Sequence, residues 1–312
     1  MYKDPHDVKK IASLGGGPIG AGWAAYFLSR GYIVKSYIHS KQEESSYRVI
    51  IDTAWESLKD LGLSKDATLE NLLISNKLDE VLKEVDFVQE SISEILDIKR
   101  EFYRTLGDLV PKNVVIASST SGLTMTQIQK FCSTPERTVI GHPFNPPYIL
   151  PLVEIVGGKN TEPPAIQWAS NFYEISGKKP LIMKKEIPGF VATRLQEALW
   201  REALHMVNAG EASPEQIDMA LIHGPAPRMA VQGQCMAFHV ACGEGGMSTN
   251  LDQFGPLLGL PWTRLRAPKL TKKLRNQMVD GCNKMAKGKH FSDMARQRDR
   301  SLVAVLNALK NS

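Results

Sequence analysis

Short apolar runs alternate with amphipathic stretches along the first half of the chain. The apolar runs have the length and the polar boundaries of buried strands. They lie at residues 8–14, 33–38, 86–88, 114–118, 139–141, 152–156 and 180–183. The stretches with helical spacing of apolar residues lie at residues 21–30, 43–61 and 95–106. Because strands alternate with helices, this half of the chain predicts βαβ units around a parallel sheet.

The pattern changes after the segment Ile187-Pro188-Gly189, and no strand-like run follows it in the sequence. The next apolar residues recur at helical spacing, at Leu195, Leu199, Ala203 and Met206. This spacing predicts a helix over residues 190–207. We therefore expect an α/β domain over residues 1–187 and an all-α C-terminal domain over residues 188–312.

Length and composition agree with two ordinary globular domains. The chain has 312 residues, of which 43% are hydrophobic and 23% charged, which excludes a disordered chain, collagen and a coiled-coil rod. Its 38 Lys and Arg against 33 Asp and Glu leave a net charge of +5, too small to indicate nucleic-acid binding.

The cysteine pattern and the chain's polarity suggest where the protein is found. Four cysteines without a CxxC pair exclude a disulfide framework and a zinc site, which favours a reducing, cytoplasmic compartment. The N-terminus has no apolar signal core. No run of about 18 apolar residues predicts a membrane-spanning helix.

A glycine-rich turn follows the first predicted strand. Gly15, Gly17 and Gly20 have the spacing GxGxxG, and Pro18 and Ile19 open the next helix. In this motif the first glycine permits a tight turn, and the second lets the backbone approach a pyrophosphate. The third lets the helix pack closely on the strand, and the helix N-terminus attracts the phosphates. The turn therefore predicts a Rossmann-type dinucleotide-binding domain.

The end of the second predicted strand departs from the usual dinucleotide site. An acidic residue normally accepts a hydrogen bond from the adenosine ribose there, but this chain has Ile38. His39, Ser40 and Lys41 follow, and they offer a hydroxyl and potentially cationic groups to a 2′-phosphate. The pattern favours tolerance of NADP or preference for it. The alternative is that the ribose faces solvent and NAD binds.

A histidine and a glutamate mark a second candidate site. His142 ends a predicted strand, and ligands of such sheets bind beyond the carboxyl ends of the strands. Glu154 lies within the apolar run 152–156, where a carboxylate is unfavourable without a partner. As a pair they would form an acid–base unit in which the carboxylate fixes the imidazole tautomer. The spacing leaves open a core histidine and an unrelated glutamate.

Four motifs together resemble the L-3-hydroxyacyl-CoA dehydrogenase superfamily over nearly the whole chain. They are the glycine-rich turn, Ser118-Ser119-Thr120-Ser121-Gly122-Leu123, His142-Pro143-Phe144-Asn145-Pro146 and Pro188-Gly189-Phe190. Further stretches resemble the L-carnitine dehydrogenase branch, with L-gulonate 3-dehydrogenase (lambda-crystallin) nearby. These are EALWREAL at 197–204, GEGGM at 243–247, QFGP at 253–256 and PWT at 261–263.

The resemblance implies roles for individual residues. His142 matches the catalytic base, Glu154 its orienting carboxylate and Ser121 the serine that hydrogen-bonds the reacting oxygen. Asn145, in the same motif as His142, is expected among the catalytic residues. The implied reaction moves the proton of a 3-hydroxyl to the histidine and a hydride from carbon 3 to the nicotinamide. The residues that match cofactor-side positions are Glu94 and Lys99.

Two residues depart from the family pattern. Ser119 stands where the family often has asparagine, and Thr193 falls on the family's active-site asparagine. Both departures affect the expected substrate geometry, since threonine keeps a donor but is shorter. They leave the His142–Glu154 pair unchanged, so hydride transfer is expected, and an unusual substrate stays an open alternative.

The second domain carries a candidate substrate residue. Arg228 matches an arginine of the carnitine and gulonate branches, and its guanidinium could hold the carboxylate of a free acid. The alternative is a surface or interdomain arginine. Met229 follows it where carnitine dehydrogenases typically have tryptophan. Since a quaternary ammonium prefers an aromatic face, the loss of that tryptophan weakens the match to carnitine. Phe144, Tyr148 and Trp200 could contribute aromatic surface, with a place in the core as the alternative for each.

Basic charge concentrates in residues 264–312, which hold 13 Lys or Arg and 3 Asp or Glu. This segment is either a solvated helical face or a site for the phosphates of coenzyme A. A coenzyme A site would indicate a thioester substrate in place of a free acid.

The sequence predicts an NAD(P)-dependent dehydrogenase that oxidises the 3-hydroxyl of a small, L-carnitine-like acid or reduces the matching 3-keto acid. One alternative is a 3-hydroxyacyl-CoA dehydrogenase or a biosynthetic 3-keto reductase acting on a CoA thioester. Another is a crystallin-like protein that binds the cofactor without turnover. By resemblance, the helical domain is expected to bind substrate and to form a homodimer. No metal, nucleic acid or membrane is expected as a partner.

Overall fold

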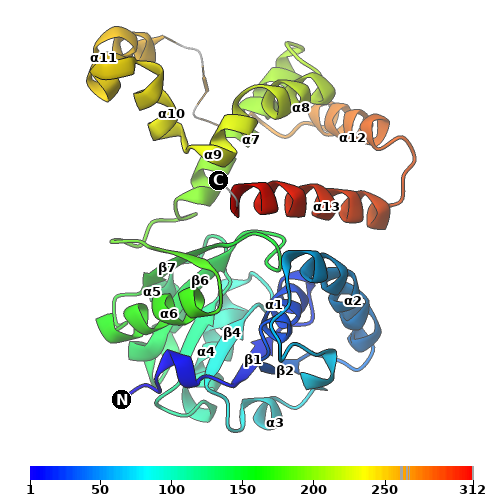
Figure 1. Ribbon diagram of the computed structural model, residues 1–312, viewed down its shortest axis with the longest axis vertical. Coiled ribbons are helices and arrows are strands. Elements are labelled where there is room, and N and C mark those ends of the chain that lie inside the picture. Colours follow the sequence, from blue (N-terminus) through cyan, green and yellow to red (C-terminus); the bar gives the residue numbers. More distant parts are fainter. Residues whose placement is uncertain (261–262, 265, 267, 311–312) are drawn as a thin grey trace. The chain divides into compact units, whose positions relative to one another are not determined.

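The computed structural model describes residues 1–260, 263–264, 266 and 268–310. Pro261 and Trp262 of the PWT motif lie outside these residues. The chain divides into two compact units (Figure 1). The first unit comprises residues 1–193 and 298–307, and the second comprises residues 194–297 and 308–312.

The first unit is built on one eight-stranded sheet with the order β3-β2-β1-β4-β5-β6-β7-β8. Its strands are β1 (Lys10–Leu14), β2 (Ile33–Tyr37), β3 (Leu72–Ser75), β4 (Phe87–Glu90), β5 (Val115–Ser118), β6 (Thr138–Pro143), β7 (Leu152–Gly157) and β8 (Lys179–Ile182). The helices around it are α1 (Pro18–Ser29), α2 (Glu43–Leu61), α3 (Leu78–Leu82), α4 (Leu96–Leu109), α5 (Met125–Ile128) and α6 (Pro163–Ile175). The predicted helix over 43–61 is confirmed at both ends by α2, whereas the sequence pattern missed β3 and α6.

The direction of the strands differs from the prediction at one place. The six strands from β3 to β6 are parallel, but β7 pairs antiparallel with β6, and β8 then runs parallel to β7. A parallel pair needs a crossover of a dozen or more residues. The link over residues 144–151 is too short for one, so the chain turns back beside β6.

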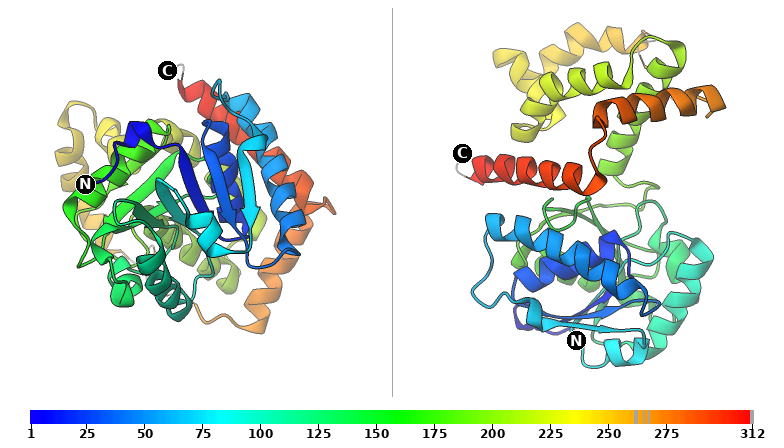
Figure 2. Two further views of the ribbon diagram at one scale, coloured as in Figure 1. Left: turned by 90° about the horizontal axis from the view of Figure 1, so that it is seen from below. Right: turned by 90° about the vertical axis from the view of Figure 1, so that its right-hand side faces the viewer.

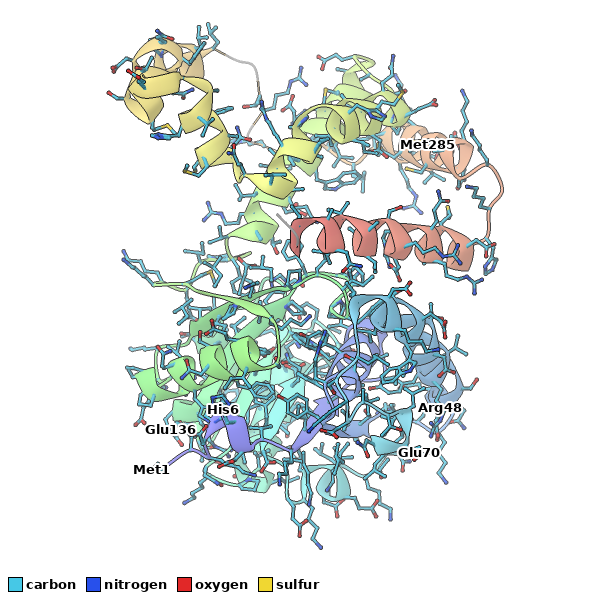
Figure 3. The ribbon with its side chains drawn as sticks, in the orientation of Figure 1. Met1, His6, Arg48, Glu70, Glu136 and Met285 are labelled. Atoms are coloured by element: carbon cyan, nitrogen blue, oxygen red, sulfur yellow. The ribbon has the colours of Figure 1, made fainter. Side chains whose placement is uncertain are left out.

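Alternation along the strands creates an apolar layer on each face of the sheet, beneath the helices that flank it (Figure 2). Ile11 and Phe87 pack on the face covered by α1, α2 and α6, whereas Ala12 and Val88 pack on the face covered by α3, α4 and α5. Charged side chains such as Arg48 and Glu70 are exposed around this core (Figure 3). A strand buried on both faces explains why the runs in the sequence are continuously apolar.

A segment of the last helix completes the first unit. Helix α13 (Phe291–Lys310) contributes residues 298–307 to this unit, and Val303 is buried in the apolar cluster of α1 and α2. The hydroxyl of Tyr148 donates a hydrogen bond of 2.6 Å to Asp299, which is buried. The apolar pattern of this segment does not reveal which surface it covers.

The described residues of the second unit form helices and loops. The helices are α7 (Ala192–Ala209), α8 (Pro214–His223), α9 (Pro225–Val231), α10 (Gln234–Ala241), α11 (Gly246–Phe254) and α12 (Lys272–Ala286), with the remaining ends of α13. A small apolar cluster of Ala203, Val207, Ile217 and Leu274 holds α7, α8 and α12 together. The expected fold class, a Rossmann-type domain followed by a helical one, is confirmed. No helix in the described part of the chain is both long and apolar enough to cross a membrane.

Candidate active site

His142 and Glu154 form a buried pair on two neighbouring strands. His142 lies near the end of β6 and Glu154 lies on β7, and the antiparallel register places them directly opposite each other. The distance from the Nδ1 atom of His142 to the Oε2 atom of Glu154 is 2.9 Å. Cross-strand neighbours on one face of a sheet are close enough for this contact. The contact expected from the sequence is therefore present, and its catalytic role stays a prediction.

Glu154 is held in its ionised form by further donors. Its Oε1 atom accepts hydrogen bonds from the backbone N–H groups of Val191 (2.8 Å) and Ala192 (2.9 Å). Burial alone would raise the pKa of Glu154, but the hydrogen bonds from His142, Ala192 and Val191 lower that pKa below its usual value. The two backbone donors come from the turn after Pro188 and Gly189, and no sequence pattern predicts them.

An ionised carboxylate fixes the protonation of the histidine ring. A carboxylate only accepts hydrogen bonds, so the Nδ1 atom of His142 must carry its hydrogen. The Nε2 atom is then the hydrogen-bond acceptor of the ring. No side chain in the described part of the chain makes a hydrogen bond to it. Phe144 and Phe190 lie against the ring, with centroids 5.8 and 5.3 Å from that of His142. The histidine can therefore take a proton from a ligand beside an apolar wall.

The other predicted catalytic and substrate side chains of the first unit are free to contact a ligand. Asn145 and Ser121 are exposed, whereas Thr193 is half-buried. Within the described residues, no hydrogen bond is made by the side chains of these three residues. Their polar groups are therefore available, and their roles stay predictions.

Ser119, the first departure from the family pattern, is the centre of a hydrogen-bond network. Its hydroxyl accepts from the Nε1 atom of Trp23 (3.2 Å) and the Nε2 atom of Gln89 (2.8 Å), and it contacts the Ser91 hydroxyl at 2.8 Å. The small side chain fits between these three groups. Serine is therefore accommodated by its surroundings without an unpaired buried polar atom.

Glu94 and Lys99 belong to a second charged cluster. Glu94 accepts a hydrogen bond of 2.9 Å from the backbone N–H of Ser121, which positions the serine loop. The Nζ atom of Lys99 is 3.5 Å from Glu94 and 2.6 Å from the carboxylate of Glu90, and Lys99 and Glu90 are both buried. Glu90 also accepts from the hydroxyl of Ser118 at 2.6 Å. Glu90 is not among the residues predicted from the sequence, although a charged residue that ends an apolar strand is a signal for a buried ion pair.

The glycine-rich turn has the shape that a dinucleotide requires. Gly15 has a φ of +129°, and a Cβ atom there would lie 2.4 Å from the backbone oxygen of Ser91. A Cβ atom at Gly20 would lie 2.1 Å from the oxygen of Gly15. A Cβ atom at Gly17 would meet no atom within 4 Å and would instead fill the open space above the turn. Helix α1 begins there without a side-chain cap, so its first N–H groups are available to phosphates.

A cavity of about 700 Å³ lies over this turn. Its floor consists of the predicted residues Gly15, Gly17, Pro18 and Ile19, together with Gly16. His39 also lines it, whereas Ser40 and Lys41, both described, are not among its lining residues. Lining residues that the sequence analysis missed are Tyr37, Glu43, Ser91, Ile92, Ser93, Ile98 and Phe102. Most of these follow β2 and β4, the two strands that flank β1, and this topology was not available from spacing alone.

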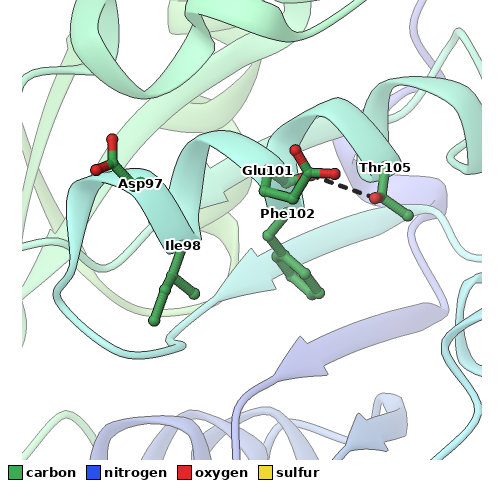
Figure 4. Close-up of a pocket in the computed structure, with 5 residues that line it drawn as sticks. All are labelled: Asp97, Ile98, Glu101, Phe102 and Thr105. Atoms are coloured by element: carbon green, nitrogen blue, oxygen red, sulfur yellow. Dashed lines mark hydrogen bonds between the residues drawn. The ribbon is translucent and has the colours of Figure 1, made fainter.

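One wall of the cavity is apolar. Ile98 and Phe102 project from α4, and the ring of Phe102 stacks with that of Tyr37 at a centroid distance of 6.2 Å. The same two side chains line a second depression of about 490 Å³ with Asp97, Glu101 and Thr105 (Figure 4). A flat apolar wall beside a phosphate-binding turn suits the adenine end of a dinucleotide. The residues present therefore fit NAD.

Arg228 lies in the second unit and is exposed on α9. No ion pair of its guanidinium occurs in the part of the chain that the structure describes. A free guanidinium agrees with a carboxylate-binding role and with a surface arginine, so its function stays a prediction. No cluster of three or more His, Cys, Asp or Glu that could hold a metal ion occurs in the described ranges.

Two family models match the chain. The 3-hydroxyacyl-CoA dehydrogenase NAD-binding domain matches residues 10–187, and the 3-hydroxyacyl-CoA dehydrogenase C-terminal domain matches residues 189–292. The chain therefore belongs to the 3-hydroxyacyl-CoA dehydrogenase family. It is an oxidoreductase that acts on a CH–OH group and uses NAD, which confirms the predicted family and enzyme class.

Individual relatives are similar to this chain over nearly its whole length. A protein named L-carnitine dehydrogenase from Streptomyces coelicolor is 48% identical over 304 residues, covering 97% of this chain and 96% of that protein. Another of the same name from Bacillus cereus is 40% identical, covering 98% and 94%.

Solved structures show the same fold. A 5-formyl-3-hydroxy-2-methylpyridine 4-carboxylic acid 5-dehydrogenase, an NAD⁺-dependent dismutase, matches with a TM-score of 0.83 at 28% identity, covering 97% of this chain and 99% of that one. An (S)-3-hydroxybutyryl-CoA dehydrogenase from Ralstonia eutropha shares the fold with a TM-score of 0.63 at 24% identity, covering 90% and 95%.

Proposed function

We propose that this enzyme oxidises the 3-hydroxyl of a small free 3-hydroxy acid of the L-carnitine type, with His142 as general base. The observation that carries the proposal is the buried contact of 2.9 Å between His142 and Glu154, with the Nε2 atom left as the acceptor. The names of relatives that are 40–48% identical over nearly the whole chain support the class of substrate.

The proposed reaction divides the alcohol's two hydrogens between two acceptors. NAD supplies the hydride acceptor for the hydrogen on carbon 3. His142 takes the hydroxyl proton at its Nε2 atom, and Glu154 stabilises the imidazolium that forms. The products are a 3-keto acid, NADH and a proton that the histidine later releases to solvent. In reverse, the imidazolium protonates the oxygen of the 3-keto group as hydride arrives.

Neighbouring side chains would orient the substrate. The Ser121 hydroxyl donates to the reacting oxygen, with its loop held by Glu94. Asn145 follows β6 beyond His142 and supplies a second polar group, and Thr193 supplies a third. The ring of Phe144 lies beside that of His142, and its face suits an alkylated ammonium.

Arg228 would bind the carboxylate of the free acid. The alternative coenzyme A site in the basic segment has less support, because several of its cations already have partners. Arg264 pairs with Glu211 at 2.6 Å, and Arg298 pairs with Asp299 at 2.7 Å. These pairs leave fewer cations available to a polyanion, which favours the solvated face.

The preferred form of the cofactor follows from the cavity. Tolerance of NADP through His39, Ser40 and Lys41 was the expectation from sequence, but of these only His39 lines the cavity over the turn. The carboxylate of Glu43 also lines it. We therefore propose NAD as the preferred cofactor, with NADP bound less well.

We also propose a homodimer formed through the second unit. Large apolar side chains stand exposed on its helices, among them Leu195, Leu199, Met219 and Ile222. Such a surface is typical of an interface. A sedimentation-velocity mass of one chain at micromolar concentration would contradict it.

We also propose a cytoplasmic location. This proposal rests on the cysteine pattern, and all four cysteines are free in the structure.

Initial rates on a short panel test the function. The panel contains L-carnitine, L-gulonate, L-3-hydroxybutyrate and 3-hydroxybutyryl-CoA, each with NAD and NADP. We expect turnover of a free acid with NAD, and a loss of about 10²- to 10⁴-fold in His142→Ala. Turnover of the thioester alone would overturn the free-acid proposal. Cofactor binding without any turnover would indicate the crystallin-like alternative.

A further inference from the structure

The strand-end position that normally binds the adenosine ribose cannot do so in this chain. Ile38 follows β2 directly, is 1% exposed and packs in the apolar cluster with α1 and α2. Its side chain carries no hydrogen-bond acceptor and points into the core. Any acceptor for the ribose hydroxyls must therefore come from another part of the cavity over the glycine-rich turn.

Glu43 is a carboxylate that the fold brings to this place from five residues further along the chain. It is the first residue of α2, and its Oε2 atom accepts a hydrogen bond of 3.3 Å from the backbone N–H of His39. The same Oε2 atom would be 2.4 Å from a Cβ atom at Gly16. The carboxylate thus lies between the end of β2 and the middle of the glycine-rich turn, and it lines the cavity.

A tight turn explains this placement. The N–H of Glu43 donates to the backbone oxygen of Ser40 at 3.1 Å, and the N–H of Glu44 donates to that of Lys41 at 3.2 Å. These bonds fold residues 39–43 back on themselves, so the Glu43 side chain returns to the strand end that it follows. Ser40 and Lys41 occupy the bend and do not line the cavity.

We propose that Glu43 replaces the missing strand-end acid as the acceptor for the adenosine ribose hydroxyls and thereby makes the site selective for NAD over NADP. A carboxylate accepts the 2′-hydroxyl as a charge-assisted hydrogen bond and repels a 2′-phosphate. Glycine at position 16 is required because any side chain there would displace the carboxylate. This inference rests on the proposed function only in placing the dinucleotide over the turn, and it is independent of the hydroxy acid.

Binding without turnover tests the inference. Titration calorimetry would give dissociation constants for NADH and NADPH, and for 5′-ADP and 2′,5′-ADP, with the wild-type protein and with Glu43→Gln. We expect the wild type to bind NADH at least about tenfold more tightly than NADPH. In Glu43→Gln the preference should shrink by about tenfold, mainly through tighter NADPH binding.

Matched variants isolate the carboxylate. Glu44→Gln changes the neighbouring acid, which pairs with Arg48 at 2.8 Å and does not line the cavity. It should keep the wild-type preference, and so should Lys41→Ala. Equal binding of NADH and NADPH by the wild type would overturn the inference, as would an unchanged preference in Glu43→Gln. A loss of NADPH binding in Lys41→Ala would also overturn it.

The two proposals can fail separately. If Glu43→Gln changes the preference in calorimetry while no hydroxy acid is turned over, the ribose inference stands and the proposed function falls. If an acid is turned over with NAD but the preference does not depend on residue 43, the reverse holds. Thermal unfolding of each variant confirms that the protein titrated is folded, and Glu43→Asp provides a second variant that keeps the charge but shortens its reach.

Discussion

The two units of this chain differ in how much of their apolar surface they bury. The first unit has apolar clusters on both faces of its sheet, and Glu154 and Lys99 of its site each have a buried partner. In the second unit the described apolar cluster consists of Ala203, Val207, Ile217 and Leu274.

The difference in apolar burial suits the two units to different tasks, acid–base chemistry in the first and binding of another molecule in the second. Strand register in the first unit fixes the His142–Glu154 distance, so acid–base geometry does not depend on flexible loops. The second unit leaves side chains such as Leu199 and Met219 exposed, which suits a surface that binds another molecule. We therefore expect the first unit to hold the chemistry and the second to supply recognition and assembly.

The largest predicted effect tests the core of the first unit. Phe87 is fully buried, with its ring 4.5 Å from that of Phe172 and 5.7 Å from that of Trp168. Phe87→Ala should lower the free energy of unfolding by about 3–5 kcal/mol, because it removes contacts and leaves a cavity. Guanidinium titration measures this change. Val49→Ala, at an exposed position of α2, should stay within about 0.5 kcal/mol. A similar loss in both variants would contradict the comparison.

The next effect is on the chemistry of the first unit. Glu154→Gln keeps the size of the side chain but removes the charge that stabilises the imidazolium. We expect kcat to fall by about 100-fold, with the dissociation constant of NADH unchanged. Stopped-flow single turnovers and calorimetry give the two numbers. A kcat within threefold of the wild type would show that the pair is structural, and would refute the proposed mechanism.

The same variant also tests how the stability of the fold depends on pH. Since hydrogen bonds lower the pKa of Glu154 in the folded state, its ionised form stabilises the fold above the unfolded pKa of about 4.3. That contribution is lost as pH falls through the lower folded pKa. The stability difference between wild type and Glu154→Gln should therefore be largest near neutral pH and shrink on acidification. A difference that grows between pH 7 and pH 3 would contradict this sign.

A smaller effect tests the second unit. Arg228→Lys keeps the charge but loses the two parallel donors of the guanidinium, so KM for the free acid should rise about tenfold while kcat changes little. Steady-state kinetics at saturating NAD measures both. Arg201→Lys, at an exposed position of α7, is the matched control. An unchanged KM in Arg228→Lys would remove this residue from substrate recognition.

The smallest effect concerns the segment that returns to the first unit. Tyr148→Phe removes the hydroxyl that donates to Asp299 and should lower the free energy of unfolding by about 1 kcal/mol. Tyr32→Phe removes a hydroxyl with no hydrogen bond to the described residues, and should have less effect. If the two variants are equally stable, the Tyr148–Asp299 bond contributes little to holding residues 298–307.

The sequence predicted what depends on local pattern. The GxGxxG turn follows from its spacing and its place after the first strand. The spacing of His142 and Glu154 allowed either a pair or two unrelated residues, and the antiparallel register of β6 and β7 brings them into contact. The sequence missed what depends on tertiary contacts. Examples are the antiparallel β7, the buried partner Glu90 and the carboxylate of Glu43, which reaches the cavity only because residues 39–43 fold into a tight turn. Residues far apart in sequence, such as Tyr148 and Asp299, carry no pattern that reveals their contact.

The division of the first unit into two segments has a consequence for synthesis. Residues 298–307 bury Val303 in a cluster that otherwise forms from the first 193 residues. A ribosome must translate all of residues 194–297 between these two parts. During that interval the nascent Rossmann domain exposes the apolar surface that Val303 later covers. Chaperones that recognise exposed apolar surface are therefore expected to engage the growing chain at this stage.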